Sequence, residues 1–399
     1  MLSYETSAKG PIPMTTTLEP PTTTKAFTPQ PKEVAVQAAG VLDISGNGPG
    51  FLRLADLLPT SHDVQVPPAL IRRLGLRKGD LIQGTCGRPR VLAEVERVNG
   101  RPVQELRGRP RFGDLTPLHP RQQLRLETAK GGVTPRLVDL FTPIGKGQRG
   151  LIVAPPKTGK TVLLQQLAAS VATNHPEAHL MVVLLDERPE EVTDMRRSVR
   201  GEVFASTFDQ PAKAHIALAE LAVERAKRLV EDGRDVVILL DSLTRLCRAH
   251  NNAASSGGRT LSGGVDASAL IGPKRFFGAA RLAEEGGSLT VLATALVDTG
   301  SRADDYFFEE LKSTGNMEIR LDRTLAERRI HPAVDLAQSG TRREELLLPE
   351  AELAVVRGLR RALQSRDGHA GLETLVERIR QTPDNATFLR QVQSTVPTV

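Results

Sequence analysis

Residues 150–174, GLIVAPPKTGKTVLLQQLAASVATN, join a short apolar run, a turn with glycine and lysine, and a helical stretch. In such a turn the backbone N–H groups of residues 157–160 would wrap a β-phosphate, Lys160 would reach the β- and γ-oxygens, and Thr161 would hold Mg²⁺. The turn opens with Ala154, where the usual pattern has glycine. A bare GKT also occurs in surface turns, but the flanking strand and helix patterns favour a nucleoside triphosphate site.

Two other apolar runs end in acids that suit this chemistry. VVILLDS places Asp241 at the carboxyl edge of a predicted strand, where it would orient a water in the Mg²⁺ shell. LMVVLLDE places Asp186 and Glu187 at another such edge, where a carboxylate would activate or position the attacking water. Each acid alone could be a helix N-cap, and the phosphate loop upstream favours the catalytic interpretation.

The elements that must position these residues alternate between strands and helices. This alternation predicts an α/β fold, a parallel sheet covered by helices on both faces, over residues 150–399. The last 50 residues, with apolar residues three and four apart, are expected to form a helical cap. The predicted strands are 151–154, 180–186, 236–241 and 289–294, and the predicted helices are 161–174, 189–200, 211–232 and 273–284.

The chain upstream divides into three segments of different composition. Residues 1–35 are rich in Thr and Pro and predict a disordered tail. Residues 36–111 contain five short apolar runs separated by Gly, Pro and Asn, which predicts a small β-barrel of the oligonucleotide-binding (OB) type. Residues 112–149 are expected to be a connector.

The basic charge of the chain is concentrated in one segment. The net charge is +6, and residues 50–130 alone hold 15 Lys and Arg against 8 Asp and Glu. This bias indicates a polyanion-binding module, although it is also compatible with a surface that only confers solubility. Phe51 and Arg53 would offer a stacking ring and a phosphate contact on one strand, unless Phe51 belongs to the barrel core.

Several classes of protein are excluded by composition. No run approaches the roughly 18 apolar residues of a membrane helix, and the N-terminus lacks the pattern of a signal peptide. We therefore expect a cytoplasmic protein without membrane contact. Cys86 and Cys247 are far apart and neither belongs to a CxxC motif, which favours reduced thiols over a disulfide or a zinc site.

Two loops downstream of the acidic strand ends carry basic residues. Residues 250–267 are rich in Gly and Ser and contain Arg259, and residues 298–305 contain Arg302. Either loop could be a plain exposed connection or could contact a nucleic-acid backbone.

These motifs together resemble the bacterial transcription termination factor Rho family. The similarity runs almost unbroken from about residue 37 to 350, and even Ala154 matches the family's loop. Several of the matching strings are far longer than a general ATPase motif. The strings are APPKTGKTVLLQ, LLDERPEEVTDMRR, ILLDSLTRL, GPKRFFGAAR and SGTRREELL.

The resemblance implies a RecA-like ATPase domain after an OB-type RNA-binding barrel. It also implies a homohexamer that binds nascent single-stranded RNA, threads it through the ring with ATP and Mg²⁺, and dislodges the RNA polymerase elongation complex. The implied catalytic residues are Glu187, Lys160, Arg342 as a finger from the neighbouring subunit, Arg329 as a second sensor, and Arg188 beside Glu187. The implied nucleotide contacts are Pro156, Lys157, Thr158, Gly159, Lys160, Thr161, Val162, Asp241 and His331. The implied RNA contacts are Phe51, Arg53, Asp63, Arg72, Arg73, Arg259, Leu261, Gly263, Gly264, Val265 and Arg302.

The sequence departs from the family at three places. The Thr/Pro tail stands where a helical bundle is usual, and His331 stands where a phenylalanine would stack on adenine. In the barrel, Gln65 replaces an expected tyrosine, and the segment 88–91 is shortened and lacks a second one. These changes predict a weaker base-stacking platform.

Two other kinds of protein contain similar domains. A rotary or secretion ATPase also has a barrel before a phosphate-loop ring, but it handles protein, and the basic barrel and the Arg259 loop speak against it. The second alternative, an RNA-binding module with a vestigial nucleotide site, would not need the complete set of catalytic residues. That set is Lys160, Thr161, Glu187, Asp241 and Arg342.

Overall fold

The computed structural model describes residues 36–393, except 45, 47, 55, 107, 131, 255–259 and 365–367. The predicted tail, residues 1–35, and the predicted RNA contact Arg259 therefore lie outside the described residues. Among the residues described, no helix is both long enough and apolar enough to cross a membrane.

The first folded part is a barrel of five strands that a short sixth strand extends, as its alternating sequence predicts. The hydrogen-bonded order is β3-β2-β1-β4-β5-β6, and a β3–β5 pairing at Gln65 and Val91 closes it. Leu42, Leu52 and Ile82 fill its interior and are fully buried. The elements are β1 (Val36–Ile44), β2 (Gly50–Arg53), β3 (Val64–Val66), α1 (Pro68–Leu74), β4 (Leu81–Arg88), β5 (Val91–Val98) and β6 (Arg101–Pro102).

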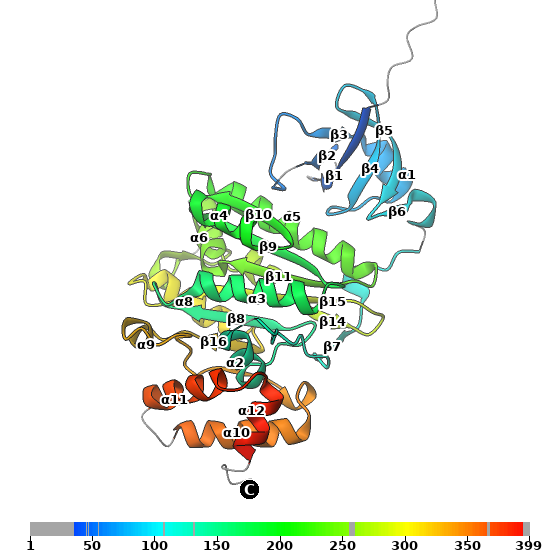
Figure 1. The fold of residues 1–399 in the computed structure, drawn as a ribbon. Helices are drawn as coiled ribbons and strands as arrows, with labels where there is room; N and C mark the ends of the chain where they lie inside the picture. Colours follow the sequence, from blue (N-terminus) through cyan, green and yellow to red (C-terminus); the bar gives the residue numbers. More distant parts are fainter. Residues whose placement is uncertain are drawn as a thin grey trace, which may run out of the picture. The chain divides into compact units, whose positions relative to one another are not determined.

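The second part is built on a nine-stranded sheet, largely parallel, as the alternation of strands and helices predicts (Figure 1). Its main order is β10-β9-β11-β15-β8-β16-β17, and β14 and β7 continue from β15. The strands are β7 (Pro117–Leu118), β8 (Arg149–Ala154), β9 (His179–Glu187), β10 (Glu202–Thr207), β11 (Asp235–Asp241), β14 (Arg281–Ala283), β15 (Ser288–Leu296), β16 (Met317–Arg320) and β17 (Gly340–Thr341). A separate hairpin pairs β12 (Thr260–Leu261) with β13 (Val265–Asp266).

Helices cover both faces of this sheet. Alternate residues of the central strands point to opposite faces, so each face has its own core. One core contains buried residues of α2 (Val133–Phe141), α3 (Lys160–Asn174), α4 (Pro189–Ser198) and α9 (Arg323–Glu327). The other contains buried residues of α5 (Ala212–Glu231), α6 (Leu243–Ala253), α7 (Ile271–Phe277) and α8 (Arg302–Lys312).

Three helices follow near the C-terminus, where helical packing was expected. They are α10 (Glu350–Gln364), α11 (Gly368–Arg380) and α12 (Asn385–Gln393) (Figure 1). Arg136 of α2 fixes them to the sheet domain, because its buried guanidinium donates to the Ile379 and Thr382 carbonyls at 2.7 and 2.6 Å and to Asn385 Oδ1 at 3.1 Å. Hydrogen bonds from a charged donor in a buried position are among the stronger ones.

The structure differs from the sequence-based expectation at several elements. The helix predicted over 273–284 is wrong beyond Phe277, because residues 281–283 form β14 on the edge of β15. Strand β10 and helix α6 were not predicted. The segment expected as a connector, 112–149, instead contains α2, whose side chains, Leu137 and Phe141 among them, are buried in the sheet domain's core.

Candidate active site

The phosphate loop joins the end of β8 to the start of α3. Lys157 and Gly159 have left-handed backbone angles, φ 66° and 90°, which turn the chain sharply around the helix N-terminus. Thr158 is buried, and its hydroxyl donates to the Pro155 carbonyl at 2.8 Å, which holds the turn closed. Pro156, Lys157 and Gly159 stay exposed. The unoccupied N–H groups of the first helical turn and its dipole suit an anion.

Three residues predicted from separate motifs meet beside this loop. Lys160 Nζ lies 2.6 Å from Asp241 Oδ1 and 3.4 Å from Glu187 Oε1. Both acids are almost fully buried, and the Thr294 hydroxyl also donates to Asp241 at 2.8 Å. Burial, and next the charge of Asp241, raise the pKa of Glu187, whereas Lys160 opposes that rise. A carboxylate pair that already holds one cation has the charge and oxygen donors that Mg²⁺ prefers.

The direction of Glu187 depends on a β-bulge that the sequence analysis did not foresee. Met181, Val183 and Leu185 of β9 face the core that contains α5 and α6, and regular alternation would send Glu187 to that same face. The pairing with β10 instead shifts from Leu185 opposite Ser206 to Glu187 opposite Thr207.

Asp186 is the extra residue of this bulge. Its φ is 56°, in the left-handed region that Asp and Asn tolerate better than other side chains. The bulge turns Glu187 toward α3 and Lys160. Asp186 itself accepts a 2.5 Å hydrogen bond from Arg245 of α6, and the Nε of the same arginine lies 3.6 Å from Glu187 Oε1.

A pocket of about 610 Å³ opens beside the phosphate loop. It brings the predicted nucleotide contacts Thr158, Gly159, Val162 and His331 to one place. Val162 and His331 are both exposed, as an open binding surface requires. Arg380 of α11 also lines this pocket, and the sequence analysis missed it because no local motif marks a residue so far along the chain.

Arg342, one of the predicted catalytic arginines, lies far from this cluster within its own chain. Arg342 follows β17, where Thr341 pairs with Met317, and Met317 pairs with Gly150 at the beginning of β8. Lys160 follows the other end of β8. A strand rises about 3.3 Å per residue, so the length of β8 separates Arg342 from the phosphate loop of its own chain by more than about 13 Å.

The two other arginines are exposed. Arg329 follows α9 in a left-handed conformation, and Arg188 directly follows Glu187 at the start of α4.

The predicted RNA contacts of the barrel are partly exposed. Phe51 is 36% exposed and lies opposite Gln65 in the β2–β3 pairing, so the two form one surface. Arg72 and Arg73 are exposed on α1. Arg53 differs from the expected free phosphate contact, because its guanidinium binds Asp43 at 2.6 Å and Asp63 at 2.5 Å and only 11% of its side chain is exposed.

The two predicted RNA loops of the sheet domain lie together. Leu261 pairs with Val265 across the β12–β13 hairpin, and Gly263 and Gly264 form its turn with φ 76° each. A Cβ on Gly263 would come within 3.2 Å of the backbone of Arg302, so the hairpin turn packs on the first residue of α8. Val265 is fully buried and anchors the hairpin.

Two family profiles match the chain in the same order as its two folded parts. Residues 38–104 match the Rho termination factor RNA-binding domain, and residues 134–341 match the nucleotide-binding domain of the ATP synthase alpha/beta family. The first match covers the barrel, and the second covers the sheet from α2 to β17.

Curated relatives are similar over nearly the whole chain. The transcription termination factor Rho of Streptomyces coelicolor is 71% identical over 96% of this chain and 91% of its own length. The Rho of Streptosporangium roseum is 58% identical over 96% of this chain and 99% of its own length.

A solved structure of an ATPase from the type III secretion system of pathogenic bacteria matches with a TM-score of 0.59. It covers 71% of this chain and 89% of its own at 20% identity. An identity this low supports the shared fold alone.

The left-handed angle of Asp186 in the bulge predicts different effects for two substitutions at this residue. Asp186→Asn keeps a side chain that tolerates the left-handed angle, whereas Asp186→Val opposes it by about 1–2 kcal/mol. We expect Asn to retain most ATP turnover and Val to lose about 10²-fold, because Glu187 would move away from its working position. Steady-state ATPase rates of both variants are compared. Both substitutions remove the carboxylate of residue 186 that pairs with Arg245. Equal loss in both variants would assign the effect to that pair instead.

The raised pKa of Glu187 predicts the pH dependence of turnover. A carboxylate must be deprotonated to accept a proton, so activity should be lost as pH falls through the raised pKa, at a higher pH than for an ordinary glutamate. Glu187→Gln should keep ATP binding, lower turnover by about 10²–10⁴-fold, and remove this acid limb. Rates and nucleotide binding measured across pH test this, and near-normal turnover in the variant would contradict it.

Proposed function

This chain belongs to the Rho family of transcription termination factors, and from that premise we propose that it is an ATP-driven RNA translocase. It binds nascent single-stranded RNA on its barrel, moves the RNA through a ring of six identical chains, and releases RNA polymerase. The observation that carries the proposal is the cluster of Lys160, Glu187 and Asp241 beside the phosphate loop, in a chain that also has a Rho-type RNA-binding barrel.

ATP is the substrate of the proposed reaction. The loop residues 157–160 bind the phosphates through backbone N–H groups, and Lys160 then exchanges its carboxylate partners for the β- and γ-oxygens. Thr161 and Asp241, the latter through water, would hold Mg²⁺, which neutralises charge on the phosphates when bound. Once Lys160 moves, Glu187 is free to accept a proton from the attacking water.

The adenine and ribose occupy the pocket beside the loop. Val162 contributes an apolar surface, and the imidazole of His331 stacks on the base. Imidazole is a smaller ring than phenyl, so we expect this stacking to contribute less than a phenylalanine would.

Arginine residues from the neighbouring chain complete the site. Arg342 lies at the opposite end of β8 from Lys160, so within one chain it cannot reach the same phosphate. We assign it as the finger that stabilises the transferring phosphoryl group bound to the next chain, with Arg329 as a second contact across the interface. Arg188 acts beside Glu187 of its own chain.

RNA contacts belong to two places. On the barrel, Phe51 provides the stacking ring while Arg72 and Arg73 provide phosphate contacts. Arg53 and Asp63 shape that surface through their ion pair. In the ring, the β12–β13 hairpin and Arg302 hold the translocating strand. Arg259 belongs to this hairpin segment, outside the described residues.

The ATPase rate with and without poly(C) tests the proposed function. The alternative considered from the sequence is a secretion-type ATPase that handles protein. An RNA translocase should hydrolyse ATP many times faster with RNA, whereas a secretion-type ATPase should not respond. A vestigial nucleotide site would show no hydrolysis in either condition.

The separation of Arg342 from Lys160 predicts complementation between chains. Rings of Arg342→Ala chains alone, or of Lys160→Ala chains alone, should lose about 10³–10⁵-fold in rate because each site lacks one part. Mixed rings should regain activity, since some interfaces then combine an intact Lys160 with an intact Arg342. ATPase assays on mixtures, with co-assembly verified by two affinity tags, measure this. Co-assembled rings no more active than either parent would rule out a shared site.

A further inference from the structure

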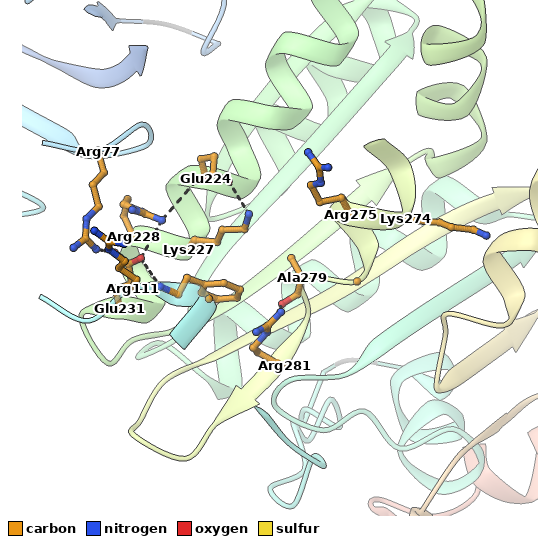
Figure 2. A pocket seen from close by; sticks show the side chains of 13 residues that line it. Arg77, Arg111, Glu224, Lys227, Arg228, Glu231, Lys274, Arg275, Ala279 and Arg281 are labelled. Carbon is orange, nitrogen blue, oxygen red and sulfur yellow. Dashed lines mark hydrogen bonds and ion pairs between the residues drawn. The ribbon is translucent and has the colours of Figure 1, made fainter. Parts of the chain in front are cut away.

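A second pocket, of about 700 Å³, lies away from the phosphate loop and is strongly basic (Figure 2). Its walls come from α5, the end of α7 and the segment after it, the turn at Arg111–Gly113, and Arg77 after helix α1. Seven of the residues that line it are Arg or Lys, and two, Glu224 and Glu231, are acidic. No role assigned above involves it.

The two carboxylates of this pocket already have hydrogen-bond or ion-pair partners within the chain. Glu231 accepts from Arg77 at 2.9 Å, from Arg228 at 3.0 Å and from the backbone N–H of Phe112 at 2.8 Å. Glu224 accepts from Lys227 at 2.6 Å. Lys274 is paired with Glu310 at 2.6 Å, outside the pocket lining. Within the described ranges, Arg111, Arg275 and Arg281 have no carboxylate partner.

Two of the arginines are also poorly hydrated. Arg228 is 8% exposed, and its buried Nε has no acceptor among the described residues. Arg281 lies 4.5 Å from the centre of the Phe112 ring. Burial lowers the pKa of both guanidinium groups, which means that each would gain from a nearby anion. An unpaired buried donor and an excess of cations point to a ligand with several negative charges.

We infer that this pocket binds the phosphodiester backbone of single-stranded RNA, as a contact separate from the barrel surface and the β12–β13 hairpin. The inference rests on the proposed RNA binding of the chain. Arg77 is four residues beyond Arg73, so the end of α1 joins the barrel's predicted phosphate contacts to this pocket. Phe112 is buried with cations at its ring, so it cannot stack a base, and the contact should be independent of RNA sequence.

The test compares two double variants of the full chain. Arg111→Glu with Arg275→Glu reverses two exposed pocket charges that have no carboxylate partner within the described chain. Arg200→Glu with Arg361→Glu is the matched control, with the same charge change at exposed arginines outside the pocket. Binding of labelled oligo(C) without nucleotide is measured at several salt concentrations. One oligomer has about 8 nucleotides, enough for a single barrel, and the other is several-fold longer.

For the long oligomer, we expect the pocket variant to bind about tenfold more weakly at moderate salt, with a log–log salt slope shallower by about 1.4. Each phosphate contact on a single strand contributes about 0.7 to that slope. Binding of the short oligomer should stay within about twofold of the unmodified chain, and so should both oligomers with the control variant. Equal thermal unfolding midpoints verify the fold, and Arg111→Gln with Arg275→Gln replaces the first pair if the Glu variant does not fold.

Two results would overturn this inference. Unchanged affinity and salt slope for the long oligomer would mean that RNA does not enter the pocket, and equal losses for both oligomers would place the effect on the barrel. If the unmodified chain bound neither oligomer, the proposed function itself would fail. Binding by the unmodified chain therefore tests the proposed function, and the difference between the two oligomers tests the role of the pocket.

Discussion

The active site depends on the cost of burying two carboxylates side by side. Glu187 and Asp241 lie at the ends of neighbouring strands, almost without solvent. The ammonium group of Lys160 contacts both and offsets their repulsion, and Arg245 Nε, 3.6 Å from Glu187 Oε1, adds a second cation. The carboxyl edge of the sheet therefore attracts cations before any nucleotide arrives. In the proposed reaction an incoming triphosphate would draw Lys160 away, and the acids would then need another positive charge, which a metal ion bound with the nucleotide would supply. Substrate binding and metal binding would in this way be coupled by charge.

Two features of the backbone create that arrangement. The parallel sheet places the ends of β8, β9 and β11 at one edge, which brings residues far apart in sequence to the same cluster. The bulge at Asp186 then chooses which face of the sheet Glu187 meets. Without the added residue, Glu187 would point into the core on the α5 side of the sheet. With it, Glu187 lies beside the phosphate loop.

Local sequence patterns were sufficient to predict the barrel, the phosphate loop and the strand-end acids. Each is encoded by a few neighbouring residues, such as the apolar run that ends at Asp241. The bulge was not predictable in that way, because it exists only in the register between β9 and β10, and β10 itself was missed. The wrong end of the helix predicted from 273 has a similar cause, since residues 281–283 pair with β15 rather than continue a helix. Arg380 lines the pocket beside the phosphate loop through tertiary packing of α11, for which the local sequence offers no signal.

The position of Arg342 at the far end of β8 has a consequence for stoichiometry. With Lys160 at one end of the strand and the arginine at the other, each chain of the proposed ring would carry two halves of different sites. The number of complete sites would then equal the number of closed interfaces, not the number of chains. A closed ring would have one site per chain, a ring with a gap would lose one, and a lone chain would have none. Opening the proposed ring to admit a strand would therefore inactivate the site at the gap, so that loading and hydrolysis there would exclude each other.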